Sequence, residues 1–107
     1  MFFFHKKPVP YQRKSIEEGL QDKAEKLILD VRSKEEYANG HLPGSKNLPL
    51  SSIRDIKELT RNKKLALYVY CRSGARSRRA CKALCAYGFE DVKDIGGIMR
   101  YKGKLDT

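Results

Sequence analysis

Short apolar runs alternate with segments of mixed apolar and polar residues along most of this chain. The runs at residues 27–29 and 65–70 are long enough for strands that are covered on both faces of a sheet. Strands that alternate with helices predict a parallel sheet, because right-handed crossover connections place helices on both of its faces. The pattern therefore predicts a three-layer α/β/α fold. Its expected strands are residues 11–14, 27–29, 47–50, 65–70 and 92–95.

Local signals mark where the helices begin. Ser15 with Glu18, and Ser33 with Glu36, have the spacing of a capping box. In this motif the serine oxygen and the glutamate carboxylate satisfy N–H groups that have no partner inside the helix. Gly88 is suited to end the helix that follows the longest apolar run. The expected helices are residues 16–26, 33–39, 53–59 and 76–87, with a last turn over 98–102.

Length and composition predict one small globular domain. A chain of 107 residues can enclose a single core, and 40% apolar residues argue against disorder. Residues 1–10 are expected to form an irregular basic N-terminal arm, and residues 11–107 the domain. The apolar start of the arm is too short for a signal peptide or a membrane span. We therefore expect a soluble, cytoplasmic protein with no membrane span in this chain.

The chain has three cysteines, Cys71, Cys81 and Cys85. An odd number without a CxxC pair fits neither a disulfide framework nor a zinc site, so we expect reduced thiols and no metal. Cys81 and Cys85 lie four residues apart on one face of a predicted helix, where small residues fill a core. A redox role, in which either one closes a disulfide with Cys71, stays open.

Cys71 has different surroundings from the other two cysteines. It ends the run at 65–70, and small and cationic residues separate it from a predicted helix. Backbone N–H groups of such a turn, the positive end of the helix and nearby arginines favour thiolate over thiol. Ligands of parallel sheets bind where strands lead into helices, as here. We predict that Cys71 is a nucleophile. The loop residues expected to bind an anionic substrate are Arg72, Ser73, Gly74, Ala75 and Arg76.

Asp30 follows the run at 27–29 and is expected at the same sheet edge as Cys71. No histidine is placed to complete a catalytic triad. We therefore expect Asp30 to bind the guanidinium of Arg32 or Arg76 and to hold the geometry of the loop. Asp30, Arg32 and Ser77 are assigned supporting roles.

The net charge of +10 arises from 23 Lys+Arg against 13 Asp+Glu. Such a charge favours anionic partners, such as a small anion or an acidic protein. Nucleic acid is not favoured, because the basic cluster after Cys71 has no interleaved aromatic residues. This cluster consists of Arg72, Arg76, Arg78, Arg79 and Lys82.

Motifs spread over residues 15–104 occur together in a characteristic order and spacing. They are LDVR at 29–32, EEY at 35–37, GHLPGS at 40–45, NLP at 47–49, YCRSGARS at 70–77, GF at 88–89 and GGI at 96–98. This set resembles the rhodanese (sulfurtransferase) domain family, in which the segment around Cys71 is the active-site loop. Many family members carry Trp shortly after the Gly-Gly pair, where this chain has Tyr101.

The resemblance implies a five-stranded parallel sheet between helices, and sulfane-sulfur transfer without a metal or organic cofactor. The Cys71 thiolate would take the outer sulfur of a small anionic donor, thiosulfate or another persulfide, and itself become a persulfide. A thiol or cyanide would then accept that sulfur, and the positive charge would also suit an acidic sulfur-acceptor protein. Loop N–H groups would stabilise the anionic sulfur, as an oxyanion hole does.

Two other functions stay open. A cysteine phosphatase or arsenate reductase on the same fold uses the spacing C-x5-R, whereas Cys71 and Arg76 have C-x4-R. A loop one residue shorter suits a sulfur atom better than a phosphate. The second alternative is a sulfur-relay or protein-binding module without free turnover.

Overall fold

The chain folds around one parallel sheet, whose strand order is β1-β5-β4-β2-β3. The computed structural model describes residues 10–107. Apart from Pro10, the expected N-terminal arm therefore lies outside the described residues. The five strands are β1 (Gln12–Arg13), β2 (Lys26–Asp30), β3 (Lys46–Asn47), β4 (Ala66–Cys71) and β5 (Val92–Gly97). The predicted five-stranded parallel sheet is confirmed.

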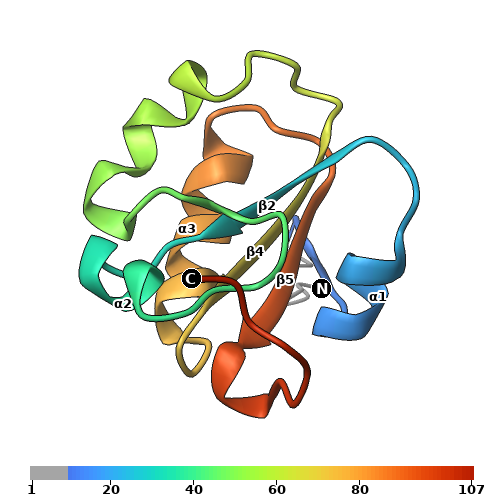
Figure 1. Cartoon of the computed structure of the whole chain (residues 1–107). Helices are drawn as coiled ribbons and strands as arrows, with labels where there is room; N and C mark the ends of the chain where they lie inside the picture. The colour runs from blue at the N-terminus through green and yellow to red at the C-terminus, as the bar shows by residue number, and fades with distance from the viewer. Residues whose placement is uncertain (1–9) are drawn as a thin grey trace, which may run out of the picture.

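Helices cover both faces of the sheet, as the pattern predicted (Figure 1). Leu67 and Val69 of β4 belong to one buried cluster, under α3 (Ala75–Ala86) and η1 (Leu50–Glu58). Tyr68 and Tyr70 belong to the other, under α1 (Ile16–Gln21). Successive side chains of a strand point to opposite faces, so a continuous apolar run supplies both clusters. The helical elements are α1 (Ile16–Gln21), α2 (Lys34–Ala38), η1 (Leu50–Glu58), α3 (Ala75–Ala86) and η2 (Ile98–Arg100).

Both capping boxes are present, but α1 is shorter than predicted. It was expected to reach residue 26 and ends at Gln21, because Asp22 turns into an extended conformation. The ammonium group of Lys26 explains this end. It donates hydrogen bonds to the carbonyl groups of Gly19, at 2.8 Å, and of Leu20 and Asp22. A residue of β2 thus satisfies carbonyl groups that α1 leaves without partners.

The phenol of Tyr70 joins β4 to two other segments inside the core. Its hydroxyl donates to Oδ2 of Asp30 at 2.8 Å and accepts the N–H of Leu42 at 3.0 Å. The Ser45 hydroxyl lies 3.0 Å from the Tyr70 hydroxyl oxygen. Burial raises the pKa of Tyr70, so the phenol keeps its proton and can donate it to the carboxylate.

We expect Tyr70→Phe to lower the free energy of unfolding by about 1–3 kcal/mol, because it leaves the buried Leu42 N–H without an acceptor. Urea denaturation of the variant and the unchanged protein measures this loss. Tyr87→Phe is the matched control, since Tyr87 is exposed and its hydroxyl makes no hydrogen bond to residues 10–107. A loss for Tyr70→Phe no larger than that of the control would contradict the assigned role.

Candidate active site

Cys71 is the last residue of β4 and is fully buried. The chain turns through three residues after it, and α3 begins at Ala75. Gly74 is the N-cap of α3 and has φ of 109°, a left-handed conformation that glycine adopts without strain. This turn folds the first residues of α3 back toward the cysteine sulfur.

Two backbone N–H groups donate to the sulfur of Cys71. The Gly74 nitrogen lies 3.0 Å and the Ser77 nitrogen 3.4 Å from Sγ. The N–H groups of Ala75 and Arg76 belong to the first turn of α3, where helix geometry provides no acceptor. The loop therefore places donors and the positive end of a helix around the sulfur, an arrangement that stabilises a negative charge there. Ser77, expected to have a supporting role, contacts the sulfur directly.

A buried carboxylate that the sequence analysis missed holds this turn in place. Oδ1 of Asp94, in β5, lies 2.8 Å from the Ser77 hydroxyl and accepts the Gly96 N–H at 2.9 Å. The same hydroxyl lies 3.0 Å from the Gly74 carbonyl oxygen. Asp94 thereby connects β5 to the first turn of α3. The signal in the sequence was the position of Asp94 inside the strand expected at residues 92–95.

Gly97, the last residue of β5, allows the strand to lie directly against the loop. A Cβ atom at this position would overlap the Arg72 carbonyl oxygen and lie 2.7 Å from the Cα of Ser73. The Met99 N–H donates to the same Arg72 carbonyl at 3.2 Å. The absence of a side chain at Gly97 is therefore required for the observed loop conformation.

Asp30 binds Arg32, one of the two partners proposed for it. The Asp30 carboxylate accepts bonds from Nη2 of Arg32 at 2.7 Å and from its backbone N–H at 2.9 Å. Nη2 also donates to the Gly40 carbonyl at 2.6 Å. Both side chains are buried, so this ion pair holds the connection after β2 rather than offering charge to a ligand.

Arg76 was expected to bind a small anion, but its guanidinium is engaged by Glu36. Nη1 and Nη2 donate to the two carboxylate oxygens at 2.6 and 3.0 Å. Glu36 also accepts from the Ser33 N–H in its capping box. The hydrogen bonds from Arg76 lower the pKa of Glu36 to about 2. Arg76 thus joins α3 to α2, whereas Arg72 is exposed on the loop.

A hollow of about 400 Å³ borders the loop on its β2 side, with Glu36, Arg72 and Met99 in its wall. Cys81 lies away from it, fully buried in the core under α3. Burial raises the pKa of the Cys81 thiol, which keeps it protonated and fits a packing role. Cys85 is half-buried, and burial raises its pKa as well.

His41 lies outside the sulfur site. Its ring stacks on Tyr37 at 3.6 Å between centroids, and its Nδ1 lies 2.8 Å from the Tyr37 carbonyl oxygen. Within residues 10–107 no three His, Cys, Asp or Glu side chains gather where they could hold a metal. None of the helices described is long and apolar enough to cross a membrane.

A protein-family model described as the Rhodanese-like domain matches residues 12–104. The chain is 38% identical over 96 residues to "Adenylyltransferase and sulfurtransferase uba4" of Ogataea parapolymorpha. This match covers 89% of the chain but only 24% of that longer protein. The chain is also 32% identical to "Putative sulfurtransferase YtwF" of Bacillus subtilis. That match covers 84% of the chain and 86% of the relative.

Among solved structures, the chain is similar to one titled "rhodanese with anions from E. coli". The TM-score is 0.72 and the sequence identity 28%, and the match covers 77% of this chain and 98% of the other. The parallel sheet and its flanking helices therefore have the same arrangement in both proteins.

The pKa of Glu36 predicts how its ion pair depends on pH. A folded-state pKa of about 2 lies below the ordinary value of 4.5, so the pair stabilises the fold above about pH 4.5. This contribution disappears as the pH falls toward 2. Glu36→Gln keeps a side-chain acceptor for the capping box but removes the charge. We expect it to cost about 1 kcal/mol at neutral pH, since the pair is partly exposed.

Unfolding free energies of Glu36→Gln and the unchanged protein, measured between pH 2 and 7, test this dependence. The difference between them should be constant above about pH 5 and vanish near pH 2. Glu35→Gln is the control, because Glu35 is exposed and forms no ion pair within the described chain. A difference that persists unchanged at pH 2 would show that the charge is not the cause.

Proposed function

Because this chain belongs to the rhodanese-like domain family, we propose that it is a sulfurtransferase that carries sulfane sulfur on Cys71. The proposed donor is a small anion such as thiosulfate, and the acceptor is a thiol or cyanide. The observation that carries the proposal is the position of the Cys71 sulfur at the start of α3. There it accepts hydrogen bonds from the backbone N–H groups of Gly74 and Ser77. These donors stabilise the negative charge that an anionic persulfide on Cys71 would carry.

The proposed reaction has two displacement steps. In the first, Sγ of the Cys71 thiolate attacks the outer sulfur of thiosulfate. A new sulfur–sulfur bond forms, the bond to the SO₃ group breaks, and sulfite leaves with the electron pair. In the second step, a thiolate or cyanide attacks the outer sulfur of the persulfide, and Cys71 leaves as the regenerated thiolate. No net oxidation of the protein occurs.

The first turn of α3 supplies the electrostatic support for these steps. The N–H groups of Ala75 and Arg76 have no acceptor within the helix and belong to the same turn as the donor Ser77. Fixed donors of this kind stabilise charge without having to reorganise during the reaction, and losing one typically costs about 3–4 kcal/mol of transition-state stabilisation. The hollow beside Arg72 is the proposed approach for the donor.

Phosphatase or arsenate reductase chemistry is less well supported. Such an enzyme would need an arginine free to clamp a tetrahedral oxyanion at the cysteine. The candidate for that role, Arg76, forms a two-point ion pair with Glu36. Together with the C-x4-R spacing, this pairing favours a sulfur atom over a phosphate at Cys71.

A sulfur relay is a second candidate, because the Ogataea relative that the chain matches over a quarter of its length is named both an adenylyltransferase and a sulfurtransferase. In a relay, Cys71 would accept sulfur in the same way but pass it to a partner protein. Persulfide formation without turnover on thiosulfate and cyanide would favour this version.

We expect thiosulfate to add one sulfur atom to the intact protein and none to Cys71→Ser, because the substitution removes the nucleophile. Intact-protein mass spectrometry detects the added sulfur, and circular dichroism checks that the variant remains folded. Cys85→Ser serves as the control and should still gain the sulfur, since Cys85 lies outside the loop. Persulfide formation on folded Cys71→Ser would refute the assignment.

A further inference from the structure

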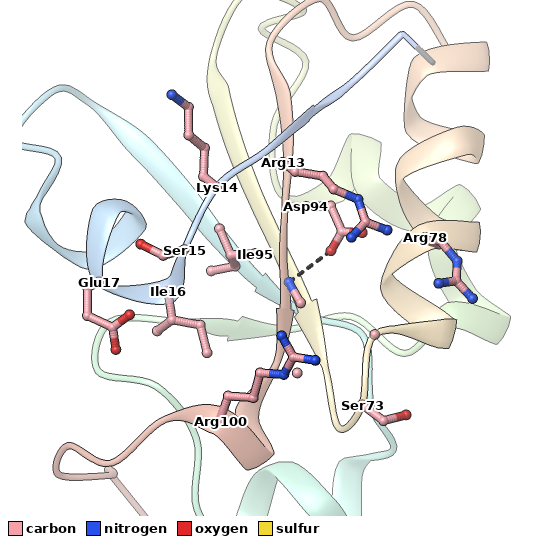
Figure 2. A pocket seen from close by; sticks show the side chains of 13 residues that line it. Arg13, Lys14, Ser15, Ile16, Glu17, Ser73, Arg78, Asp94, Ile95 and Arg100 are labelled. Atoms are coloured by element: carbon pink, nitrogen blue, oxygen red, sulfur yellow. Dashed lines mark hydrogen bonds between the residues drawn. The ribbon is translucent and has the colours of Figure 1, made fainter. Parts of the chain in front are cut away.

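A hollow of about 310 Å³ lies on the other side of the active-site loop, toward β1 and β5 (Figure 2). Its walls are formed by the end of β1, the end of β5, the start of α1, and η2. Ser73 and Gly74 of the loop complete them. Neither Cys71 nor Glu36 lines this hollow. It shares no lining residue with the hollow beside Arg72, so it is a separate site that has one wall in common with the active-site loop.

Three arginines from three different elements surround this hollow: Arg13 of β1, Arg78 of α3 and Arg100 of η2. Figure 2 shows their guanidinium groups around the same space, whereas the side chains of Lys14 and Glu17 extend away from it. No acidic side chain of residues 10–107 forms an ion pair with any of the three. Converging like charges repel one another, so the arrangement favours an anion between them.

Asp94 is the one carboxylate that Figure 2 shows among these arginines. It is buried, and its Oδ1 is held by Ser77 and Gly96. Three formal positive charges and one formal negative charge leave the pocket with a formal charge of +2. A phosphate monoester carries about −1.5 to −2 at neutral pH, which would neutralise it.

The volume of the pocket and its guanidinium donors indicate which kind of anion it can bind. Guanidinium groups present planar pairs of N–H donors that match the oxygens of phosphate. The volume is at the lower end of the range for pockets that bind small molecules, so there is space beside a phosphate group. We propose that the basic pocket formed by Arg13, Arg78 and Arg100 binds the phosphate group of a small phosphorylated molecule. This site does not depend on sulfur transfer at Cys71.

Isothermal titration with inorganic phosphate tests the proposal, using the full chain and, in parallel, its Cys71→Ser variant. Because the variant has no nucleophile, its binding is measured apart from sulfur chemistry. We expect one saturable site in both proteins. Arg78→Gln and Arg100→Gln should each weaken it about tenfold, which corresponds to about 1.4 kcal/mol for one charge-assisted contact. Absence of saturable binding would overturn the proposal and leave sulfur transfer untouched.

Arg54→Gln and Arg61→Gln are matched controls, because they remove the same charge from exposed arginines that do not line the pocket. At fixed ionic strength they should change the affinity by less than about twofold. Equal weakening by the control and pocket variants would show a diffuse charge effect and overturn the site. Succinate is the control for the type of anion, because it carries two negative charges on planar carboxylates. If succinate bound as tightly as phosphate, the assignment of phosphate as the ligand would be overturned.

Backbone amide chemical shifts locate the ligand independently. Phosphate should shift the amide signals of Ser73, Gly74 and Gly96, which lie in the pocket wall. Shifts confined to residues around Glu36 and Asn39, in the hollow on the β2 side, would place the anion elsewhere and contradict the proposal.

Discussion

The sulfur of Cys71 is buried yet surrounded by hydrogen-bond donors, and the rest of the site depends on this combination. Burial of a charged group is costly unless polar partners replace water. The strand β4 provides the burial, since it lies between β2 and β5 and is covered on both faces. The helix α3 provides the donors, since its first N–H groups have no acceptor of their own. The turn between them spans three residues, which is why Gly74 takes a left-handed conformation.

Two buried carboxylates hold this arrangement from the strands on either side of β4. Asp94 in β5 fixes Ser77 and Gly96, and so positions the first turn of α3. Asp30 in β2 binds Arg32 and Tyr70, and so fixes the segment that follows β2. Neither carboxylate hydrogen-bonds to the sulfur. Both carboxylates instead hold the segments next to the loop in position. Their contribution is therefore to the geometry of the site.

The sequence predicted what local chemistry controls. Strands buried on both faces leave continuous apolar runs, and both capping boxes form as their spacing indicates. What could not be predicted depends on contacts between different secondary-structure elements. Lys26 ends α1 from a neighbouring strand, and Asp94 meets Ser77 from 17 positions away. Glu36 was identified in a capping box and in the EEY motif, and neither indicates that it also binds Arg76, 40 positions along the chain.

The pairing of Arg76 with Glu36 changes how the strong positive charge of the chain relates to its chemistry. The donors at the Cys71 sulfur are backbone amides. Such dipoles are fixed by the fold and stabilise negative charge on the sulfur. The guanidinium groups of Arg13, Arg78 and Arg100, which form no ion pair within residues 10–107, lie instead on the β1 and β5 side of the loop. The net charge of +10 is therefore weak evidence about sulfur chemistry and stronger evidence for an anion beside it.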